Sequence, residues 1–265
     1  MVNQNGLPKE CKKYLFWQDH KPAEELYDIE NDPEEIRNLA DDPAFGEVRD
    51  ELRGKLFGWM IETRDLGLID EPEIVSRAAA YNGVSHAVGA HCNNFERILE
   101  TADLARLGEE GRKELLNRLD DSDSAVRFWA VTGLFSFEFD SALKPLLEPL
   151  LDDPSISVSL AAAAYFVRME EGARAIEAFT RALRNDILWT RLRAAAYLSY
   201  CNKDQLKPMK PLILVLKSAG ENQKIFGPEH DPYVGTNSFL PGQRDMIAKV
   251  WVIDRVTKRI ELSCK

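Results

Sequence analysis

The sequence has few cysteines and histidines and no long apolar run. Its four cysteines, among 265 residues, lie far apart and form no Cys-x-x-Cys pair, and only four histidines accompany them. A disulfide scaffold or a structural zinc site is therefore not expected. No apolar run reaches the ~18 residues that a membrane span needs. The first ten residues lack the apolar segment of a signal peptide, so we expect neither a span nor a signal peptide in this chain.

Positive charge is scarce as well, and its deficit is confined to one end. The net charge is −10, and residues 1–75 carry 19 acidic and 9 basic side chains, whereas residues 76–265 carry 25 of each. This asymmetry predicts a domain boundary near residue 75. It also argues against nucleic acid as a partner, because phosphate binding needs clustered positive charge. With 45% hydrophobic residues, the chain can still build one large or two modest domains.

What the second half does contain is a repeat of 32 residues. Three windows, 124–134, 156–166 and 188–198, align without gaps at that step. Several independent columns agree at the same spacing: Leu115, Leu147 and Phe179; Leu119, Leu151 and Leu183; and the small residues Ala130, Ala162 and Ala194. Agreement between columns makes this a strong repeat signal.

Each repeat is predicted to be a pair of helices. Leu115 and Leu119 place one apolar stripe on a first helix, and Val126, Ala130 and Leu134 place another on a second helix. The turns between them are rich in Asp and Ser, which cap helices. One such pair cannot bury its apolar faces, so the pairs must stack into an α-solenoid. The pattern resembles HEAT repeats, which identify a scaffold rather than a reaction.

Partial repeats are expected at both ends of this stack. Residues 94–105 align with the second helices and would cover the first repeat, and residues 211–217 take the place of a fourth first helix. Its second helix is predicted at 243–259, after an insertion at 218–242. The β-branched run 250–253 leaves a strand as the alternative there.

The acidic first segment is predicted to be a small α+β piece. Residues 12–18 and 25–30 have the composition of two strands and predict a β-hairpin. Asp32-Pro33 is typical of a helix start. The same pair at Asp42-Pro43 predicts the start of a longer helix that ends near Thr63. The predicted fold is therefore mostly α, with a HEAT-like solenoid at 76–265 preceded by a hairpin plus an amphipathic helix at 1–75.

This first segment resembles a known family. Tyr14-Leu-Phe, then Glu25-Leu-Tyr-Asp-Ile-Glu-Asn-Asp-Pro-Glu-Glu-Ile-Arg-Asn-Leu-Ala40 and a long amphipathic helix are similar to the C-terminal end of the sulfatases. These are sulfuric-ester hydrolases of the alkaline-phosphatase-like fold, and some bacterial members carry HEAT-like repeats after that point. The segments 97–105 and 126–134 are similar to those repeats.

The resemblance also implies what this chain does not contain. Sulfatases use a formylglycine, made from Cys or Ser in a Cys/Ser-x-Pro/Ala-x-Arg motif, together with a divalent metal that is usually calcium. None of the four cysteines fits that motif, and nothing matches the paired aspartates of the metal site. Asp41-Asp42 could imitate such a pair, but Pro43 favours helix capping. The resemblance implies no catalytic residue and no cofactor in this chain, and its export signal, common in the family, would lie in a missing N-terminal part.

Two other groups of residues are candidates for a site. The insertion carries Phe226, His230, Asp231, Tyr233 and Phe239, and loops inserted between repeat helices often bind partners. An ordered loop that packs these aromatics on the last helices is the alternative. An enzyme that uses His230 and Asp231 is a further, weaker possibility.

The remaining candidates have plain structural alternatives. His86, His91 and Cys92 could suggest a soft-metal site, although a linker into the first repeat is the favoured interpretation. The arginines of the second helices could form an anion-binding strip for sulfated glycans, or salt bridges with the Asp-rich turns of neighbouring repeats, which we favour. They are Arg127, Arg168, Arg191 and Arg193.

Together these observations predict a non-catalytic scaffold. Its partner would be a catalytic sulfatase domain, and the chain would be the C-terminal part of a sulfatase-like hydrolase. The alternative is a free-standing HEAT-like protein that binds another protein through its concave face.

Overall fold

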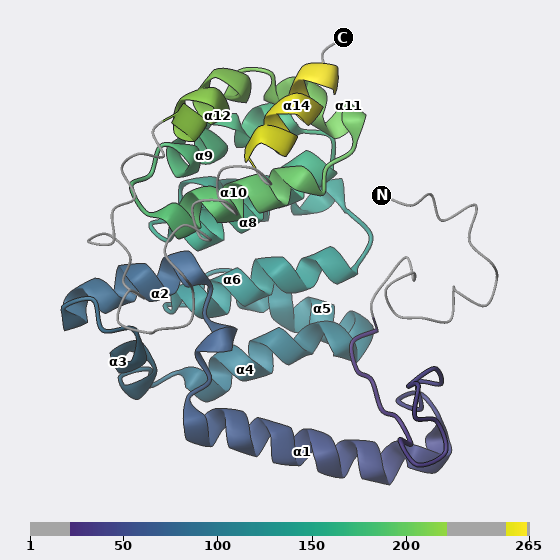
Figure 1. Cartoon of the computed structure of the whole chain (residues 1–265). Coiled ribbons are helices and arrows are strands. Elements are labelled where there is room, and N and C mark those ends of the chain that lie inside the picture. The colour runs from purple at the N-terminus through teal and green to yellow at the C-terminus, as the bar shows by residue number, and fades with distance from the viewer. Residues whose placement is uncertain (1–21, 222–252, 264–265) are drawn as a thin grey trace. The chain divides into compact units, whose positions relative to one another are not determined.

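The protein is mostly helical (Figure 1). The computed structural model describes residues 22–221 and 253–263, and no strand occurs among them. Its α-helices are α1 (Gly46–Thr63), α2 (Glu71–Ala78), α3 (Ser85–Ala90), α4 (Phe95–Asp103), α5 (Gly108–Asn117), α6 (Ser124–Gly133), α7 (Lys144–Leu147), α8 (Ile156–Arg168), α9 (Gly172–Leu183), α10 (Leu188–Ser199), α11 (Lys203–Leu206), α12 (Leu212–Glu221) and α14 (Ile253–Ser263). Short 3-10 turns extend several of them, among them η8 (Leu134–Ser136) after α6 and η10 (Glu148–Asp152) after α7, and η5 (Leu66–Leu68) lies between α1 and α2. In the part described, no helix combines the length and apolarity needed to cross a membrane.

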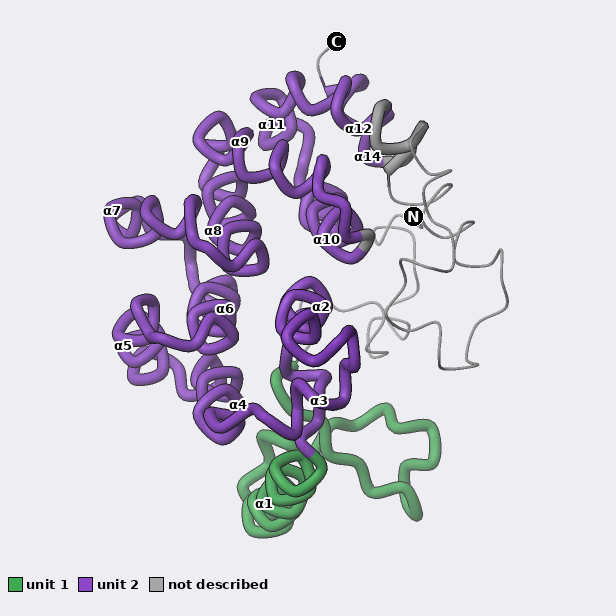
Figure 2. Tube along the Cα trace, turned by 90° about the vertical axis from the view of Figure 1, so that its left-hand side faces the viewer, with its two compact units in different colours: residues 1–63 green, residues 64–265 purple. Residues whose placement is uncertain are grey.

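The chain divides into two compact units, Met1–Thr63 and Arg64–Lys265 (Figure 2). The boundary that charge predicts near residue 75 falls inside α2 and stays a prediction about domain organisation.

The larger unit is a two-layer stack of helix pairs. Figure 2 shows α5 and α7 in one layer and α4, α6 and α8 in the next, with α9 above α8 and α10 on the side of α8 away from α7. Successive second helices pack on one another, α4 on α6, α6 on α8 and α8 on α10. This arrangement is the predicted helical stack.

The 32-residue columns point into the core, as the repeat predicts. Leu115, Leu147 and Phe179 are fully buried on the first helices, where Phe179 supplies the largest side chain. The second column, Leu119, Leu151 and Leu183, is also buried. Ala130, Ala162 and Ala194 have no exposed surface, and their small side chains let neighbouring second helices approach closely.

The turns before the second helices use the predicted Asp and Ser residues in two ways. The carboxylate of Asp123 accepts from the backbone N–H of Ala125 at 2.8 Å and caps α6 as expected. Ser155 precedes α8 in the same position, but its hydroxyl makes no capping bond. It donates instead to Glu73 at 2.6 Å.

The ends of the stack are also helical where they are described. Phe95 and Ile98 on α4 are fully buried, and α12 occupies the predicted first-helix position. The predicted helix at 243–259 is confirmed for its described part, because α14 begins at Ile253 and buries Val256 and Ile260. Most of the insertion and the run 250–252 lie outside the described residues.

The segment after the first unit lies on the other side of the second helices. Figure 2 shows α2 beside α6, α8 and α10, on the side away from α5, α7 and α9. α2 packs on both α8 and α10. We call this side of the second helices the inner face.

In the smaller unit, the predicted strand at 25–30 is wrong. These residues are extended only in part and form no ladder, and the proposed partner strand, 12–18, lies outside the described residues. The Asn38 side chain takes the place of a partner strand. Its Oδ1 accepts from the backbone N–H of Leu26 at 2.9 Å, and its Nδ2 donates to the carbonyl of Glu24 at 2.9 Å. A side chain that binds both backbone groups competes with strand pairing.

The helix expected at Asp32-Pro33 is also wrong, whereas the one after Asp42-Pro43 is correct. The Asp32 carboxylate accepts from the backbone N–H of Arg37 at 2.7 Å, and Glu35 has φ 53°, so the chain makes a turn there. A left-handed residue within the first turn prevents a helix from continuing. Asp42 instead caps a 3-10 turn that leads directly into α1.

Candidate functional site

The predicted interaction loop lies outside the described residues. Phe226, His230, Asp231, Tyr233 and Phe239 all fall in it, and their proposed roles in partner binding or in acid–base chemistry stay predictions. The sites below are built from described residues only.

Of the candidate group His86, His91 and Cys92, the last two make packing contacts, whereas His86 is exposed. The His91 ring stacks on Tyr81, with centroids 4.5 Å apart, and its Nδ1 lies 2.7 Å from the carbonyl oxygen of Ala87. Cys92 is buried, and burial raises the pKa of its thiol. Within the described ranges, no three His, Cys, Asp or Glu side chains gather in a way that could hold a metal ion.

Asp42, the candidate metal ligand beside Asp41, is a helix cap. Its carboxylate accepts from the backbone N–H of Ala44 at 3.0 Å and pairs with Arg37 at 3.2 Å. The capping interpretation is therefore confirmed for Asp42.

The four second-helix arginines have different environments. Arg127 forms two bonds of 2.8 Å with Asp153, in the turn of the next repeat, which confirms the predicted salt bridge for this residue. Arg191 donates to the backbone carbonyl of Asn185 at 2.8 Å. Arg168 lies over the ring of Phe139, 5.0 Å from its centroid.

Arg193 belongs to a different site, one that joins α2 to the inner face. Its guanidinium lies against the carboxylate of Asp70 and 2.5 Å from that of Glu71. Asp70 also accepts from the hydroxyl of Ser157, on α8, at 2.6 Å. Arg193 thus forms ion pairs between α10 and the start of α2, and not between neighbouring repeats.

Glu73 makes the second half of this site. Its carboxylate accepts from the hydroxyl of Ser155 at 2.6 Å and from the hydroxyl of Ser124, and its own neighbour Arg77 donates to it at 2.9 Å. Arg77 then pairs with Asp123 at 2.6 Å. Because Ser124 and Ser155 stand at the N-terminal ends of α6 and α8, the positive ends of both helix dipoles face this carboxylate.

The contacts come from three of the second helices and the turns before them. Trp129 and Arg193 lie two repeats apart in the same column, and the indole N–H of Trp129 donates to the carbonyl of Leu68 at 2.7 Å. Asp123 and Ser155 likewise share one column. Three second helices therefore present donors to one short segment, and Asp123, in the column of Ser155, accepts from Arg77 of that segment. We call this set the inner-face donors: Ser124, Trp129, Ser155, Ser157 and Arg193.

Burial shapes the electrostatics of this contact. Asp70 is only 5% exposed, and its desolvation raises the pKa of the carboxyl, although Arg193 and Ser157 oppose the shift. Burial also raises the pKa of the nearby Tyr197 phenol, which therefore stays neutral. The site consists of matched charges and hydroxyls and contains no activated nucleophile.

No site is predicted from the sequence in residues 65–78, so this one is missed. The signal was present, because Asp70-Glu71-Pro72 has the same form as the helix start at Asp42-Pro43. Nothing in the sequence alone, however, shows that the helix it opens lies on the inner face.

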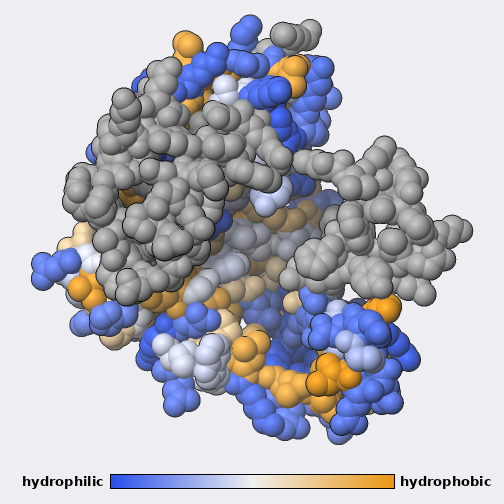
Figure 3. Space-filling view, viewed as in Figure 1, coloured by the Kyte–Doolittle hydropathy of each residue, from blue (hydrophilic) through white to orange (hydrophobic). Residues whose placement is uncertain are grey.

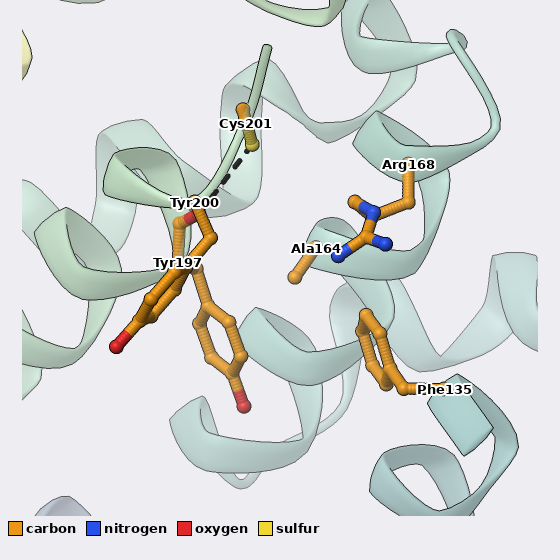
Figure 4. A pocket seen from close by; sticks show the side chains of 6 residues that line it. All are labelled: Phe135, Ala164, Arg168, Tyr197, Tyr200 and Cys201. Atoms are coloured by element: carbon orange, nitrogen blue, oxygen red, sulfur yellow. Dashed lines mark hydrogen bonds between the residues drawn. The ribbon is translucent and has the colours of Figure 1, made fainter. Parts of the chain in front are cut away.

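A small pocket lies between the C-terminal ends of α8 and α10 (Figure 4). Its volume is about 150 Å³, and it is lined by Phe135, Ala164, Arg168, Tyr197, Tyr200 and Cys201. Burial raises the pKa of the Cys201 thiol to about 11, and its Sγ lies 3.4 Å from the carbonyl oxygen of Tyr197. A protonated, buried thiol is a poor nucleophile, so this pocket offers shape and aromatic surface rather than covalent chemistry.

The smaller unit contributes an apolar surface. α1 buries none of its residues, and its predicted apolar stripe is largely open to solvent. Val48, Leu52, Leu56 and Trp59 are 49%, 47%, 51% and 55% exposed. Figure 3 shows orange, apolar surface along α1 at the bottom of the view. We call these four residues the α1 stripe.

Comparison with known proteins identifies the repeats. A family model described as HEAT repeats matches residues 112–199, the region that holds the helices from α6 to α10. No solved structure matches the chain.

Two curated relatives are similar to short segments of the chain. Both are named ulvan-active sulfatase and come from Formosa agariphila. One is 36% identical over 62 residues, which cover 23% of this chain and 10% of the relative. The other is 40% identical over 71 residues, 25% of this chain and 14% of the relative. The aligned segments thus span about a tenth to a seventh of the relatives' length.

Proposed function

We propose that this chain is the non-catalytic, C-terminal part of a sulfatase-like sulfuric-ester hydrolase. Its HEAT repeats are the scaffold, and its first unit docks on a catalytic domain of that enzyme class. Partial similarity to two sulfatases supports the family. In this proposal the formylglycine and the divalent metal, usually calcium in the parent family, belong to the catalytic domain.

The exposed α1 stripe is the observation that carries the proposal. Four large apolar side chains lie in a row on one helix, and each is about half exposed. Solubility selects against such contiguous surface unless a partner covers it. The partner surface that fits is therefore apolar, and burying the stripe would supply affinity at roughly 25 cal/mol per Å² of apolar area.

The test begins with the DNA upstream of the coding sequence. We expect a reading frame, or a longer parent gene, that encodes Cys/Ser-x-Pro/Ala-x-Arg. Its product, co-expressed with this chain, should co-purify with it and cleave an aryl sulfate, whereas this chain alone should not. Cleavage by this chain alone would refute the non-catalytic role.

Variants on α1 make the test specific. Leu52→Glu with Trp59→Glu should abolish co-purification, because both charges would be buried in the interface. Gly58→Glu is the matched control, since a Cβ there meets no atom within 4 Å and the position is exposed. If the stripe variant co-purifies as well as the control, the docking role of α1 is wrong.

A free-standing repeat protein that binds through its concave face has less support. The inner face of α8 and α10 already packs against α2. A partner that bound there would have to meet α2 or replace it.

A further inference from the structure

We propose that the inner face is a recognition surface for acidic peptide segments, and that α2 occupies it in cis. A partner's acidic segment would then bind the inner-face donors only when α2 leaves. This inference does not depend on the sulfatase proposal.

The chemistry of the contact is that of peptide recognition. The segment from Leu68 to Arg77 presents one backbone carbonyl and three carboxylates, and each of these four groups meets a donor from the repeats. The donors lie on α6, α8 and α10 or at their N-terminal ends, so three successive second helices donate hydrogen bonds to one segment. Solenoids characteristically bind extended partners on the concave surface that their stacked repeats create.

The contact is polar, although α2 is buried. Ile74 and Ala78 of α2 are 4% and 1% exposed, yet neither belongs to the continuous apolar core that runs from Leu104 to Ile260. That core holds the apolar columns of the first and second helices, and no residue of α2 belongs to it. The inner face therefore behaves as a surface that the stacked helices present, rather than as part of their interior.

Charge matching gives this surface its selectivity. Glu73 faces the N-terminal ends of two helices, and Asp70 and Glu71 share one guanidinium, that of Arg193. Helix N-termini and arginine both favour carboxylates. A basic or neutral segment of the same shape would leave these donors buried without acceptors.

The first experiment measures binding of a synthetic peptide, residues 68–78, to the full chain by fluorescence anisotropy. In the wild type, α2 is tethered at an effective concentration in the millimolar range, so micromolar peptide should bind poorly. Glu71→Gln with Glu73→Gln weakens only the resident segment, because these carboxylates accept from Arg193 and from the hydroxyl of Ser155. We expect this variant to bind the peptide at least tenfold more tightly than the wild type.

Three controls make the result interpretable. Glu110→Gln with Glu177→Gln removes the same charge from exposed positions on α5 and α9 and should leave binding at the wild-type level. A scrambled peptide of equal charge should bind poorly to every variant. Adding Arg193→Gln to the α2 variant should abolish binding of the native peptide. Equal binding by the α2 variant and the wild type, or equal binding of native and scrambled peptides, would overturn the proposal.

A second experiment needs no variant and so does not depend on its folding. Hydrogen exchange of the wild-type chain is followed with and without millimolar peptide. If the peptide traps the open face, the amides of α2 should exchange several-fold faster in its presence, while those of α8 stay protected. Unchanged exchange in α2 would contradict the proposal.

Discussion

At the scale of single residues, burial and pairing divide side chains of the same type into those that stabilise the stack and those that do not. Phe179 and Leu214 are both apolar and both lie on first helices, but Phe179 is fully buried and Leu214 is 76% exposed. The repeat columns identify Phe179 as a buried residue from the sequence, because the positions of its column are buried in each repeat.

Truncation of Phe179 should therefore be costly. Phe179→Ala removes most of a ring from a closely packed site and should lower the free energy of unfolding by about 3–5 kcal/mol. The matched change Leu214→Ala should alter it by about 0.5 kcal/mol or less. Urea unfolding followed by circular dichroism gives both values, and similar losses for the two variants would show that the column is not core.

Asp70 is the residue whose electrostatics matter most for the inner face. In the folded chain its carboxyl is desolvated, which raises its pKa above the ordinary 3.8. The groups that face it are Arg193 and Tyr197 on α10, Glu71 on α2 and the hydroxyl of Ser157 on α8. Arg193 and Ser157 favour the charged carboxylate, whereas Glu71 and burial favour the neutral acid.

The raised pKa of Asp70 predicts a pH dependence with a definite sign. The stabilising contribution of this group is fully present below pH 3.8 and is lost as the pH rises through the higher folded-state pKa. Asp70→Asn cannot titrate, so the unfolding free energy of the wild type minus that of the variant should fall between pH 4 and pH 7. Urea titrations of both proteins measure this difference. If the difference grows with pH, the ion pair with Arg193 outweighs burial.

At the scale of elements, the sequence predicts what its local patterns determine. Columns such as Leu115 and Ala130, together with Asp-rich turns, predict the helix pairs, and Asp42-Pro43 predicts the start of α1. The same device at Asp32-Pro33 fails, because the chain turns at Glu35 with positive φ. Local capping residues begin a helix only if the following backbone can continue it.

Elements that depend on distant partners are harder to predict. The composition of 25–30 suits a strand, but a strand needs a ladder, and Asn38 binds the backbone there instead. The acidic charge of α2 is visible in the sequence, but the surface on which α2 packs is not. The helix ends that α2 contacts depend on how the repeats stack. No local pattern within residues 65–78 encodes that stacking.

The Asn38 side chain should hold the first unit's extended segment in place. Asn38→Ala removes three partly buried hydrogen bonds and leaves the backbone groups of Glu24, Leu26 and Ala40 without them, at a cost of about 1–3 kcal/mol. Local opening should rise on the order of tenfold or more, and trypsin should cleave faster after Arg37, in the exposed turn. Asn31→Ala removes an exposed bond to Asp28 and is the control. Equal cleavage rates would mean that Asn38 does not hold the segment.

At the scale of the whole molecule, the two units have different energetic characters. The repeats of the larger unit share one continuous apolar core. α1 of the smaller unit buries no residue, so its exposed stripe contributes little to folding and remains free to be covered by a partner. The proposed function and the inner-face proposal therefore use different surfaces, and variants on one need not disturb the other.

Stacked repeats transmit a local defect mainly to their neighbours, which gives a prediction for the end of the stack. Ile260 on α14 is fully buried, and α14 packs on α10, α11 and α12. Ile260→Ala should cost about 2–5 kcal/mol locally. Because stability in a solenoid is close to a sum of nearest-neighbour interfaces, hydrogen exchange should accelerate most in α12 and α10 and least in α4 and α5. Leu262→Ala, at a position 52% exposed in the same helix, should change little. Uniform acceleration from α4 to α14 would instead show that the repeats unfold as one cooperative block.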